Sequence, residues 1–175
     1  QVVEFGTGRC ACGTGQSLDG LAQAVGPHGL VVGVDLSQGM IRRAQDRVLE
    51  RGLDRVKLLT ADVHSLTREA LGRATAIDRV HVFLGLSTFP RWTHAFEALW
   101  GMLEPGGRCV LVDVYSERRG LYGRLVNLIG QADTRRRFWE PLERVAVDFE
   151  RVALPYDVLH GGAILLATGI KPPRT

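Results

Sequence analysis

Hydrophobic positions follow two different spacings along this chain, and the spacing changes from one segment to the next. Short apolar runs rich in β-branched residues predict buried strands, and apolar residues three and four positions apart predict helices between them. The predicted strands cover residues 2–5, 29–35, 55–63, 77–86 and 108–114, and the predicted helices cover residues 17–25, 37–52, 65–74 and 91–103. Strands that alternate with helices in this way predict a parallel sheet with helices on both faces.

The alternation changes after residue 115. Residues 116–147 hold two predicted helical pieces, and residues 149–158 and 163–171 predict two strands joined by a glycine turn. A hairpin that closes the parallel sheet is the simplest arrangement of these elements. We therefore expect one doubly wound α/β domain spanning residues 1–175, with no second domain and no linker.

A glycine turn at residues 12–16 lies between the first strand and the first helix, and Asp35 ends the second strand. A glycine loop in this position lets a ligand approach the backbone closely, with a helix N-terminus behind it. An acidic residue at the end of the next strand suits a ribose, because a carboxylate accepts hydrogen bonds from two hydroxyls at once. Twenty residues separate Gly15 from Asp35, enough for one helix and one strand. This layout predicts a nucleotide-type cofactor site.

Other interpretations of the same residues stay open. A nicotinamide fingerprint needs a third glycine three residues after the second, where this chain has Leu18. Asp35 could serve only as a cap for the following helix, although Ser37 suits that role better. Asp62 could be a solvated turn residue, and Met40 could be a simple core residue.

Composition adds little to this picture. Hydrophobic residues make up 45% of the chain, charged residues 23%, and the net charge is +3, all ordinary for a soluble globular protein. Three cysteines are too few for a disulfide framework, and the pair Cys10 and Cys12 lacks a second pair at metal-ligand spacing, so no metal site is expected. No run approaches the ~20 apolar residues of a membrane span, and no signal peptide opens the chain. These features predict a cytoplasmic location.

Several short motifs, in order and at matching spacing, make the sequence resemble a known family. They are the glycine loop, "VGVDLS" at the second strand end, "AD" at the third, "VFLGLSTFP" at the fourth and "PGG" before the fifth. Together they resemble the class I S-adenosylmethionine-dependent methyltransferases, most of all the small-molecule and lipid branch with its quinone-biosynthesis and phosphatidylethanolamine methyltransferases. The resemblance implies a Rossmann-like, mostly parallel sheet of seven strands in the order 3-2-1-4-5-7-6, with strand 7 antiparallel. It also implies S-adenosyl-L-methionine as the cofactor and a small-molecule or lipid-like methyl acceptor.

The resemblance further implies which residues contact the cofactor. They are Glu4, Gly13, Thr14, Gly15, Asp35, Leu36, Met40, Asp62, Val63, Leu84 and Gly85. Among them, the glycine loop would lie under the methionine part, Asp35 would bind both ribose hydroxyls, and Glu4 would hold the amino group of the methionine tail. Asp62 would accept a hydrogen bond from the adenine amino group.

The remaining implied contacts complete the two ends of the cofactor. Leu36 and Met40 would flank the adenine, the Val63 amide would face a ring nitrogen, and Leu84 and Gly85 would line the methionine side. Methyl transfer from a sulfonium is an in-line displacement, so orientation of the reactants can supply much of the acceleration. No covalent nucleophile motif is seen, and no single catalytic residue is expected from the sequence.

The glycine loop departs from the family pattern in one place. The family has an acidic residue about six positions before the last glycine of the loop, but this chain has Arg9 there, and Glu4 lies eleven positions before that glycine. Either residues 7–11 are an insertion, or the loop is built from Gly6 and Gly8 instead. The departure, and the expectation that the chain lacks the family's N-terminal helices, leave a second hypothesis. In it the chain is an inactive or truncated Rossmann-like domain that serves as a binding module or is a gene fragment.

An arginine-rich stretch from Arg118 to Arg144 also contains Phe138 and Trp139. It suits an interfacial helix that contacts anionic lipid, which would make the protein membrane-peripheral. It equally suits a cover over an acidic or phosphate-bearing acceptor, or a solvated face whose aromatic residues pack on the sheet. No nucleic-acid-binding module is recognised, so nucleic acid is not an expected partner. The sequence does not indicate an oligomeric state.

Overall fold

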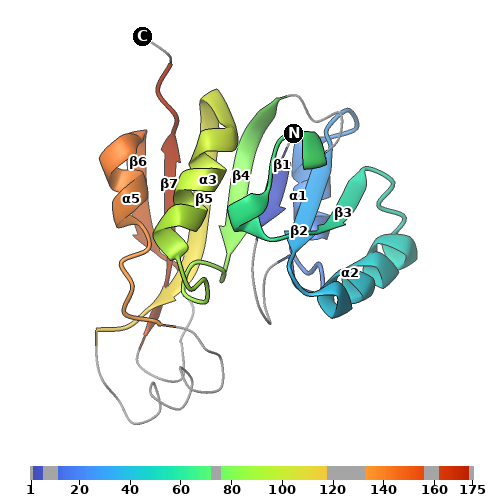
Figure 1. Cartoon of the computed structure of the whole chain (residues 1–175), viewed down its shortest axis with the longest axis horizontal. Helices are drawn as coiled ribbons and strands as arrows, with labels where there is room; N and C mark the ends of the chain where they lie inside the picture. Colours follow the sequence, from blue (N-terminus) through green and yellow to red (C-terminus); the bar gives the residue numbers. More distant parts are fainter. Residues whose placement is uncertain (1, 6–11, 72–75, 118–132, 156–161, 174–175) are drawn as a thin grey trace.

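A single seven-stranded sheet forms the centre of the protein (Figure 1). The computed structural model describes residues 2–5, 12–71, 76–117, 133–155 and 162–173, with the backbone alone for the first of these ranges. The strands are β1 (Val2–Phe5), β2 (Val31–Asp35), β3 (Val56–Thr60), β4 (Ile77–Phe83), β5 (Leu103–Tyr115), β6 (Val147–Ala153) and β7 (Ala163–Ile170). Their order in the sheet is β3-β2-β1-β4-β5-β7-β6. β7 pairs antiparallel with β5 and with β6, and the pairs among the first five strands are parallel. The predicted doubly wound α/β architecture is confirmed, and the order agrees with the one that the family resemblance implied.

Helices cover both faces of this sheet. They are α1 (Leu18–Val25), α2 (Gln38–Arg51), α3 (Trp92–Met102) and α5 (Glu140–Val145), with short 3-10 turns η2 (Val63–Ser65) and η3 (Glu69–Leu71). On one face, Leu18 of α1 and Ala44 of α2 form a small core with the strand residues Val31 and Val56. The other face carries the larger core, in which α3, η2 and α5 pack against the sheet.

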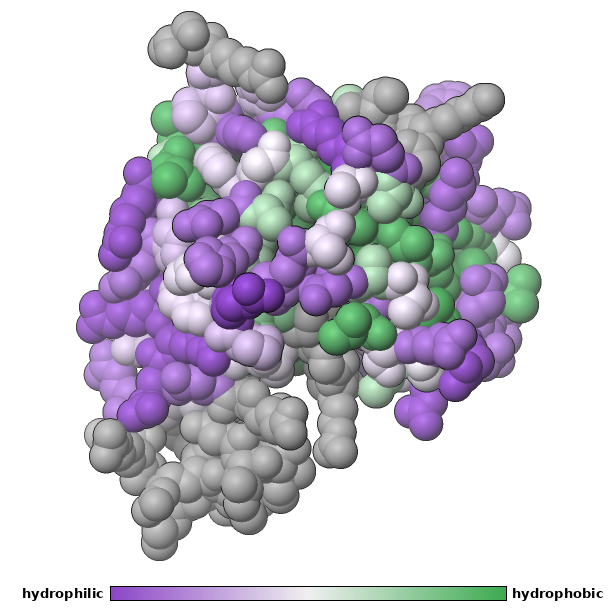
Figure 2. All heavy atoms as spheres, viewed as in Figure 1, coloured by the Kyte–Doolittle hydropathy of each residue, from purple (hydrophilic) through white to green (hydrophobic). Residues whose placement is uncertain are grey.

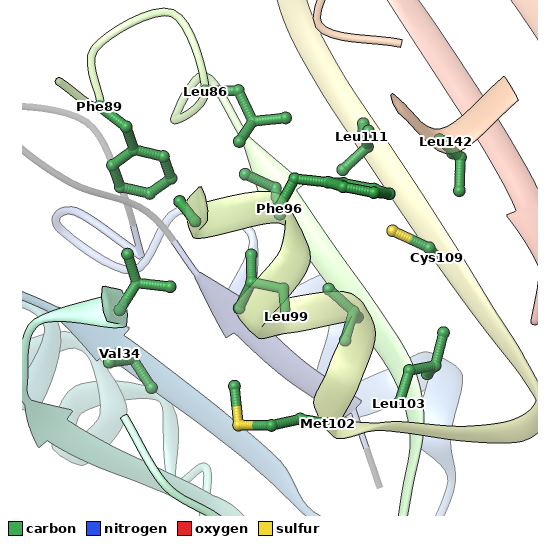
Figure 3. Packing of buried hydrophobic residues seen from close by; sticks show 14 of the residues in the cluster. Val34, Leu86, Phe89, Phe96, Leu99, Met102, Leu103, Cys109, Leu111 and Leu142 are labelled. Carbon is green, nitrogen blue, oxygen red and sulfur yellow. The ribbon is translucent and has the colours of Figure 1, made fainter. Parts of the chain in front are cut away.

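Helix α3 supplies the centre of the larger core. Its apolar residues lie at the three- and four-residue spacing of a helix that buries one face, and Ala95, Phe96, Leu99 and Met102 are all buried. Figure 3 shows Leu99 between Phe96 and Met102, with Leu111 and Cys109 of β5 nearby. This packing fixes the helix that follows the end of β4.

The bounds of α2 follow from its terminal residues. Ser37 is its N-cap, and the Ser37 hydroxyl accepts a hydrogen bond from the Met40 amide at 3.4 Å. Gly52 ends the helix with a φ of 60°, in the left-handed region that glycine adopts without strain. Both signals predict the helix correctly from the sequence.

The predicted helix over residues 65–74 is wrong. The chain forms two separate 3-10 turns there, η2 and η3, with Leu66 extended between them. Asp62 caps η2 by accepting from the His64 amide at 2.9 Å, and the Thr67 hydroxyl accepts from the Ala70 amide at 3.3 Å. Such local bonds from side chain to backbone compete with helix formation. Residues 72–75 lie outside the described part.

The predicted turn at residues 104–107 is instead the first part of β5. The Gly106 amide donates to the Lys171 carbonyl, and the Lys171 amide donates to the Gly107 carbonyl, both at 2.8 Å. The pairing of β4 with β5 shifts register at this point. Backbone pairing with the end of β7, a partner remote in sequence, therefore draws this glycine segment into the sheet. The first helical piece expected after residue 115 and most of the turn expected at residues 159–162 fall outside the described residues.

Candidate cofactor site

The carboxyl ends of β1, β2 and β4 meet at one edge of the sheet. Phe5, the last residue of β1, is in register with Val34 on one side and Val82 on the other. Asp35 follows Val34 directly, and Leu84 lies just past the end of β4. The glycine turn at residues 12–16, which leads from β1 into α1, therefore belongs to the same edge. In open α/β sheets, ligands bind at this edge, where neighbouring connections leave on opposite faces.

Asp35 is fully buried at this edge, with 0% of its surface exposed. One carboxylate oxygen accepts from the Gly13 amide at 3.2 Å, and the other accepts from the Ser37 amide at 2.7 Å. Burial raises the pKa of Asp35, and the hydrogen bonds from Ser37 and Gly13 oppose that rise. The carboxylate thus joins the glycine turn to the end of β2, while Ser37 caps α2 as the sequence indicates.

The glycine turn is held in a fixed shape. Gly13 and Gly15 have φ angles of 51° and 77°, and the Gly15 amide donates to the Cys12 carbonyl at 2.6 Å. A Cβ atom at Gly15 would lie 2.8 Å from the Leu18 side chain. From α2, Arg47 donates through Nε to the Thr14 carbonyl at 3.2 Å. The turn is therefore anchored from both β2 and α2.

Leu36 and Met40 differ in exposure. Leu36 is 54% exposed although it follows a buried strand, and Met40 in the first turn of α2 is half-buried. Figure 2 shows apolar positions gathered over β2 and β3, while hydrophilic positions dominate the region over α5 and β6. An exposed leucine beside a buried carboxylate is a suitable surface for a flat apolar ring.

The Asp62 carboxylate is hydrogen-bonded within its own turn. One carboxylate oxygen accepts from the His64 amide at 2.9 Å and lies 2.7 Å from His64 Nδ1. These hydrogen bonds lower the pKa of Asp62, and the one from the His64 amide has the larger effect. The structure thus shows Asp62 as a capping residue with a side chain that remains 44% exposed. Val63, the next residue, is buried.

The loop after β4 begins with a strained residue. Leu84 has a φ of 53°, in the left-handed region that non-glycine residues rarely occupy. Its amide donates to the Val112 carbonyl of β5 at 2.7 Å, and the carbonyl of buried Gly85 accepts from the Thr88 and Phe89 amides. Strained backbone of this kind is found preferentially at ligand sites.

The last expected contact, Glu4, is placed only through its backbone. It lies in β1 between Gly33 of β2 and His81 of β4. The segment at residues 7–11, expected to be an insertion, lies outside the described residues, as do Gly6 and Gly8. The structure therefore brings the Gly13–Gly15 turn, Asp35 and Leu84 to one edge, and it leaves the choice between the two loops as a prediction.

Sequence reasoning missed a second buried carboxylate at the same edge. Asp113 of β5 is 2% exposed and accepts from the Ser87 amide and from the Val114 amide, each at 2.8 Å. Burial raises the pKa of Asp113. An acidic residue inside the apolar run of a central strand is the sequence signal that would have indicated it.

The aromatic residues of the arginine-rich stretch lie in the core. Phe138 and Trp139 are both buried, and the Arg151 guanidinium stacks over the Trp139 ring at 4.4 Å. The expectation that these two rings reach a membrane is wrong, because the sheet already covers them, and the packing interpretation is the one observed. Arg118 and Arg124 lie outside the described residues.

The helices and the acidic, histidine and cysteine side chains of the described ranges bear on the class of protein. None of the helices there is both long and apolar enough to cross a membrane. In the same ranges, no cluster of three or more His, Cys, Asp or Glu side chains could hold a metal ion.

Comparison with known proteins adds a family match. A family model described as "Methyltransferase domain" matches residues 9–107, which is more than half of the chain. A demethylmenaquinone methyltransferase from Bacillus cytotoxicus is 30% identical over 102 residues, covering 58% of this chain and 41% of that protein. A demethylmenaquinone methyltransferase from Lactococcus lactis is 26% identical over 188 aligned positions, covering 94% of this chain and 73% of that protein. The chain thus spans about two fifths of the first of these relatives in the matched region.

A solved structure with the same fold is the phosphoethanolamine N-methyltransferase 2 of Haemonchus contortus, in complex with phosphomonomethylethanolamine and S-adenosylhomocysteine. The TM-score is 0.74 at 14% identity, and the match covers 98% of this chain and 49% of that one. At this identity the likeness concerns the fold alone.

Proposed function

We propose, from the premise that this chain belongs to the methyltransferase domain family, that it transfers a methyl group from S-adenosyl-L-methionine to a small-molecule acceptor. The observation that carries the proposal is the hydrogen bond between the Asp35 carboxylate and the Gly13 amide. It brings the acidic strand end and the glycine turn together at the edge where this fold binds ligands. We also propose that residues 1–175 form one methyltransferase domain.

In this proposal Asp35 binds the ribose of the cofactor. A carboxylate offers about four acceptor positions, and two backbone amides use two of them. Two positions are left for the ribose hydroxyls, and the amides hold the carboxylate in a fixed orientation. Because Asp35 is fully buried in this structure, ribose binding requires the surrounding chain to open locally.

The two ends of the cofactor lie on either side of Asp35. Leu36 and Met40 would contact the adenine, with Asp62 and the Val63 amide at its polar edge. The exposed side chain of Leu36 and the partly exposed carboxylate of Asp62 support this placement.

The methionine end would lie on the opposite side of the ribose. Gly13, Thr14 and Gly15 would run under it, because a turn without bulky side chains allows close approach of a ligand to the backbone. Leu84 and Gly85 would line its other side, and Glu4 at the end of β1 would hold the amino group.

The chemistry depends first on orientation. The cofactor would supply a methyl group on a positively charged sulfur. The acceptor atom would bond to that methyl carbon as the carbon–sulfur bond breaks, which releases S-adenosylhomocysteine, and an acceptor atom that carries a hydrogen would also lose a proton. The residues of this chain hold sulfur, methyl and acceptor in line, and orientation effects of this type reach roughly 7–11 kcal/mol.

For the acceptor we propose a quinol-type ring with a lipid tail. Two relatives from different bacteria are demethylmenaquinone methyltransferases, and one of the alignments covers 94% of this chain. A ring of this kind needs an apolar surface and few charged partners, and the cofactor edge offers the partly exposed side chain of Leu84.

A second candidate is a binding module without turnover. It is favoured by the burial of Asp35, whose oxygens both accept from backbone amides in this structure. This candidate predicts that the cofactor or its product binds weakly, and that no acceptor is methylated.

Thermal unfolding with S-adenosylmethionine, S-adenosylhomocysteine and NAD as separate ligands tests the proposal. A ligand at a hundred times its dissociation constant stabilises the fold by about 2.7 kcal/mol, which raises the midpoint measurably. We expect both sulfur ligands to raise it, NAD to leave it unchanged, and Asp35→Ala to abolish the effect. Asp46→Ala, an exposed position on α2, is the matched control.

Turnover is then measured with a demethylated naphthoquinol and labelled S-adenosylmethionine. Labelled product supports the quinol acceptor. A midpoint that rises without product from any quinol favours the binding module. A midpoint unmoved by either sulfur ligand at millimolar concentration contradicts the proposed function.

A further inference from the structure

The loop of residues 84–89 connects β4 to α3 and is fixed by side chains from two other parts of the chain. On one side is Asp113 near the end of β5, and on the other is Arg136, beyond the segment that follows β5. Both residues make hydrogen bonds to the backbone of the loop. Neither belongs to the residues that the family resemblance implies.

Asp113 holds the middle of the loop. One of its oxygens accepts from the Ser87 amide at 2.8 Å, and the Ser87 hydroxyl contributes a second hydrogen bond to the carboxylate. The other oxygen accepts from the Val114 amide of its own strand at 2.8 Å. The carboxylate therefore links the loop directly to the central strand β5.

Arg136 binds loop carbonyls on both sides of Ser87. Its Nη1 atom donates to the Leu86 carbonyl at 2.9 Å and to the Phe89 carbonyl at 2.5 Å. Its Nε lies 3.8 Å from the Asp133 carboxylate, and the Asp133 amide donates to the Ser87 carbonyl at 2.8 Å. Burial raises the pKa of Asp113, and the positive charge of the Arg136 guanidinium partly opposes that rise. A planar guanidinium with several donors suits such a bridge, and a lysine ammonium does not reproduce its geometry.

Stabilisation of the fold does not by itself explain why charged side chains hold this loop. Removing a carboxylate from water costs free energy, and well-packed apolar residues of similar volume are often as stabilising as buried ionic groups. What the charged groups add is a defined conformation for a loop that starts at a strained residue, Leu84, with a φ of 53°. That strain persists only where the surroundings determine the backbone.

We propose that Asp113 and Arg136 are positioning residues that hold the loop of residues 84–89 against the methionine end of the cofactor and the acceptor beside it. The inference rests on the proposed function, because the loop begins with the residues proposed to line the methionine side. It concerns only one end of the cofactor. The adenine and ribose contacts lie on β2, α2 and η2, which neither Asp113 nor Arg136 touches in the hydrogen bonds described above.

Two ligands separate the ends of the site. S-adenosylhomocysteine carries the amino-acid tail, and 5′-methylthioadenosine lacks it but retains adenine, ribose and sulfur. Their dissociation constants are measured by calorimetry for the parent protein, Asp113→Asn and Arg136→Lys. The exposed positions Asp46→Asn and Arg144→Lys are the matched controls. Hydrogen exchange of the peptide that covers residues 84–89 is measured on the same proteins without ligand.

In both variants we expect faster exchange in the loop and weaker binding of S-adenosylhomocysteine by about tenfold, because the ligand binds only to the fraction of molecules whose loop is held in the competent conformation. Binding of 5′-methylthioadenosine stays within about twofold, because its contacts lie elsewhere. Arg136→Lys retains the positive charge, so it carries the test if Asp113→Asn does not fold.

The outcomes are distinct. Folded variants whose loop exchange matches the parent overturn the inference, and so do variants that lose affinity for both ligands equally, because general destabilisation would do the same. A parent protein that binds neither ligand refutes the proposed function, and the inference falls with it. A parent that binds both ligands upholds the cofactor assignment whatever the variants show.

Discussion

The Asp35 carboxylate accepts a hydrogen bond from the Gly13 amide at 3.2 Å, although the two residues are 22 positions apart in the chain. The bond ties the end of β2 to the turn before α1. It makes the shape of the glycine turn depend on a buried acidic side chain, and the orientation of that side chain depend on the turn. A substitution at either residue is therefore expected to change the conformation of the other.

The conformation of the glycine turn can be tested with a pair of alanine substitutions. Gly15→Ala places a Cβ atom at a φ of 77° and 2.8 Å from the Leu18 side chain, so we expect a loss of at least about 1–2 kcal/mol in the free energy of unfolding. Gly20→Ala in α1 meets no atom within 4 Å and should stabilise the protein by about 0.5–1 kcal/mol. Urea unfolding of both variants checks the two signs. Equal effects at the two positions would contradict this account.

The N-cap of α2 offers a second test. Ser37→Ala removes the acceptor of the Met40 amide hydrogen bond and should cost about 1 kcal/mol in unfolding free energy. Gln38→Ala, the exposed next residue, should remain within about 0.5 kcal/mol of the parent. Both values come from urea titrations followed by circular dichroism. A loss at Gln38 as large as at Ser37 would argue against a capping role.

Packing under α3 gives a third test. Leu99 is 1% exposed within the larger core, so Leu99→Ala should reduce the free energy of unfolding by about 2–5 kcal/mol. Leu49 of α2 is 71% exposed, and Leu49→Ala should change it by less than about 0.5 kcal/mol. Thermal and urea unfolding of the two variants measure the contrast. A small effect at Leu99 would mean that α3 does not pack as described.

The acidic end of the stability profile depends on Asp62. Hydrogen bonds from His64 lower its folded pKa below the ordinary 3.8, so its contribution to stability is present above that value. The contribution is lost as the pH falls through the lowered pKa, because the unfolded chain binds the proton more readily. We therefore expect Asp62→Asn to destabilise the protein at neutral pH and to match the parent more closely at strongly acidic pH.

Urea midpoints measured from neutral pH down to below 3.8 test this expectation. Asp54→Asn, an exposed position after α2, is the control and should run parallel to the parent throughout. A difference between Asp62→Asn and the parent that stays constant over the whole range would show that the carboxylate charge is not involved.

Local signals in the sequence predict much of this fold. Ser37 and Gly52 mark the ends of α2, and the alternation of strands and helices predicts the doubly wound sheet. The family predicted from the motifs is confirmed by the match of the methyltransferase domain model to residues 9–107. These predictions are correct because each depends on neighbouring residues or on a fixed order of motifs.

The features that escaped prediction depend on distant partners. Gly106 and Gly107 look like a turn until Lys171 pairs with them. Hydrogen bonds from backbone amides to Asp62 and Thr67 replace the helix expected at residues 65–74 with short turns. Asp113 is held by a hydrogen bond from the amide of Ser87, 26 residues earlier in the chain. The contacts assigned to the site residues by family likeness remain predictions, and the ligand experiments described above test them.

The position of β7 in the sheet has a consequence for the order in which this protein can assemble. β5 pairs with β4 on one side and with β7 on the other, yet β7 comes last in the chain. During synthesis, β5 therefore leaves the ribosome with one edge unpaired and waits for residues 163–170. An open strand edge is a template for pairing with other chains. The growing chain is thus expected to be most exposed to aggregation after β5 has formed and until β7 arrives to close the sheet.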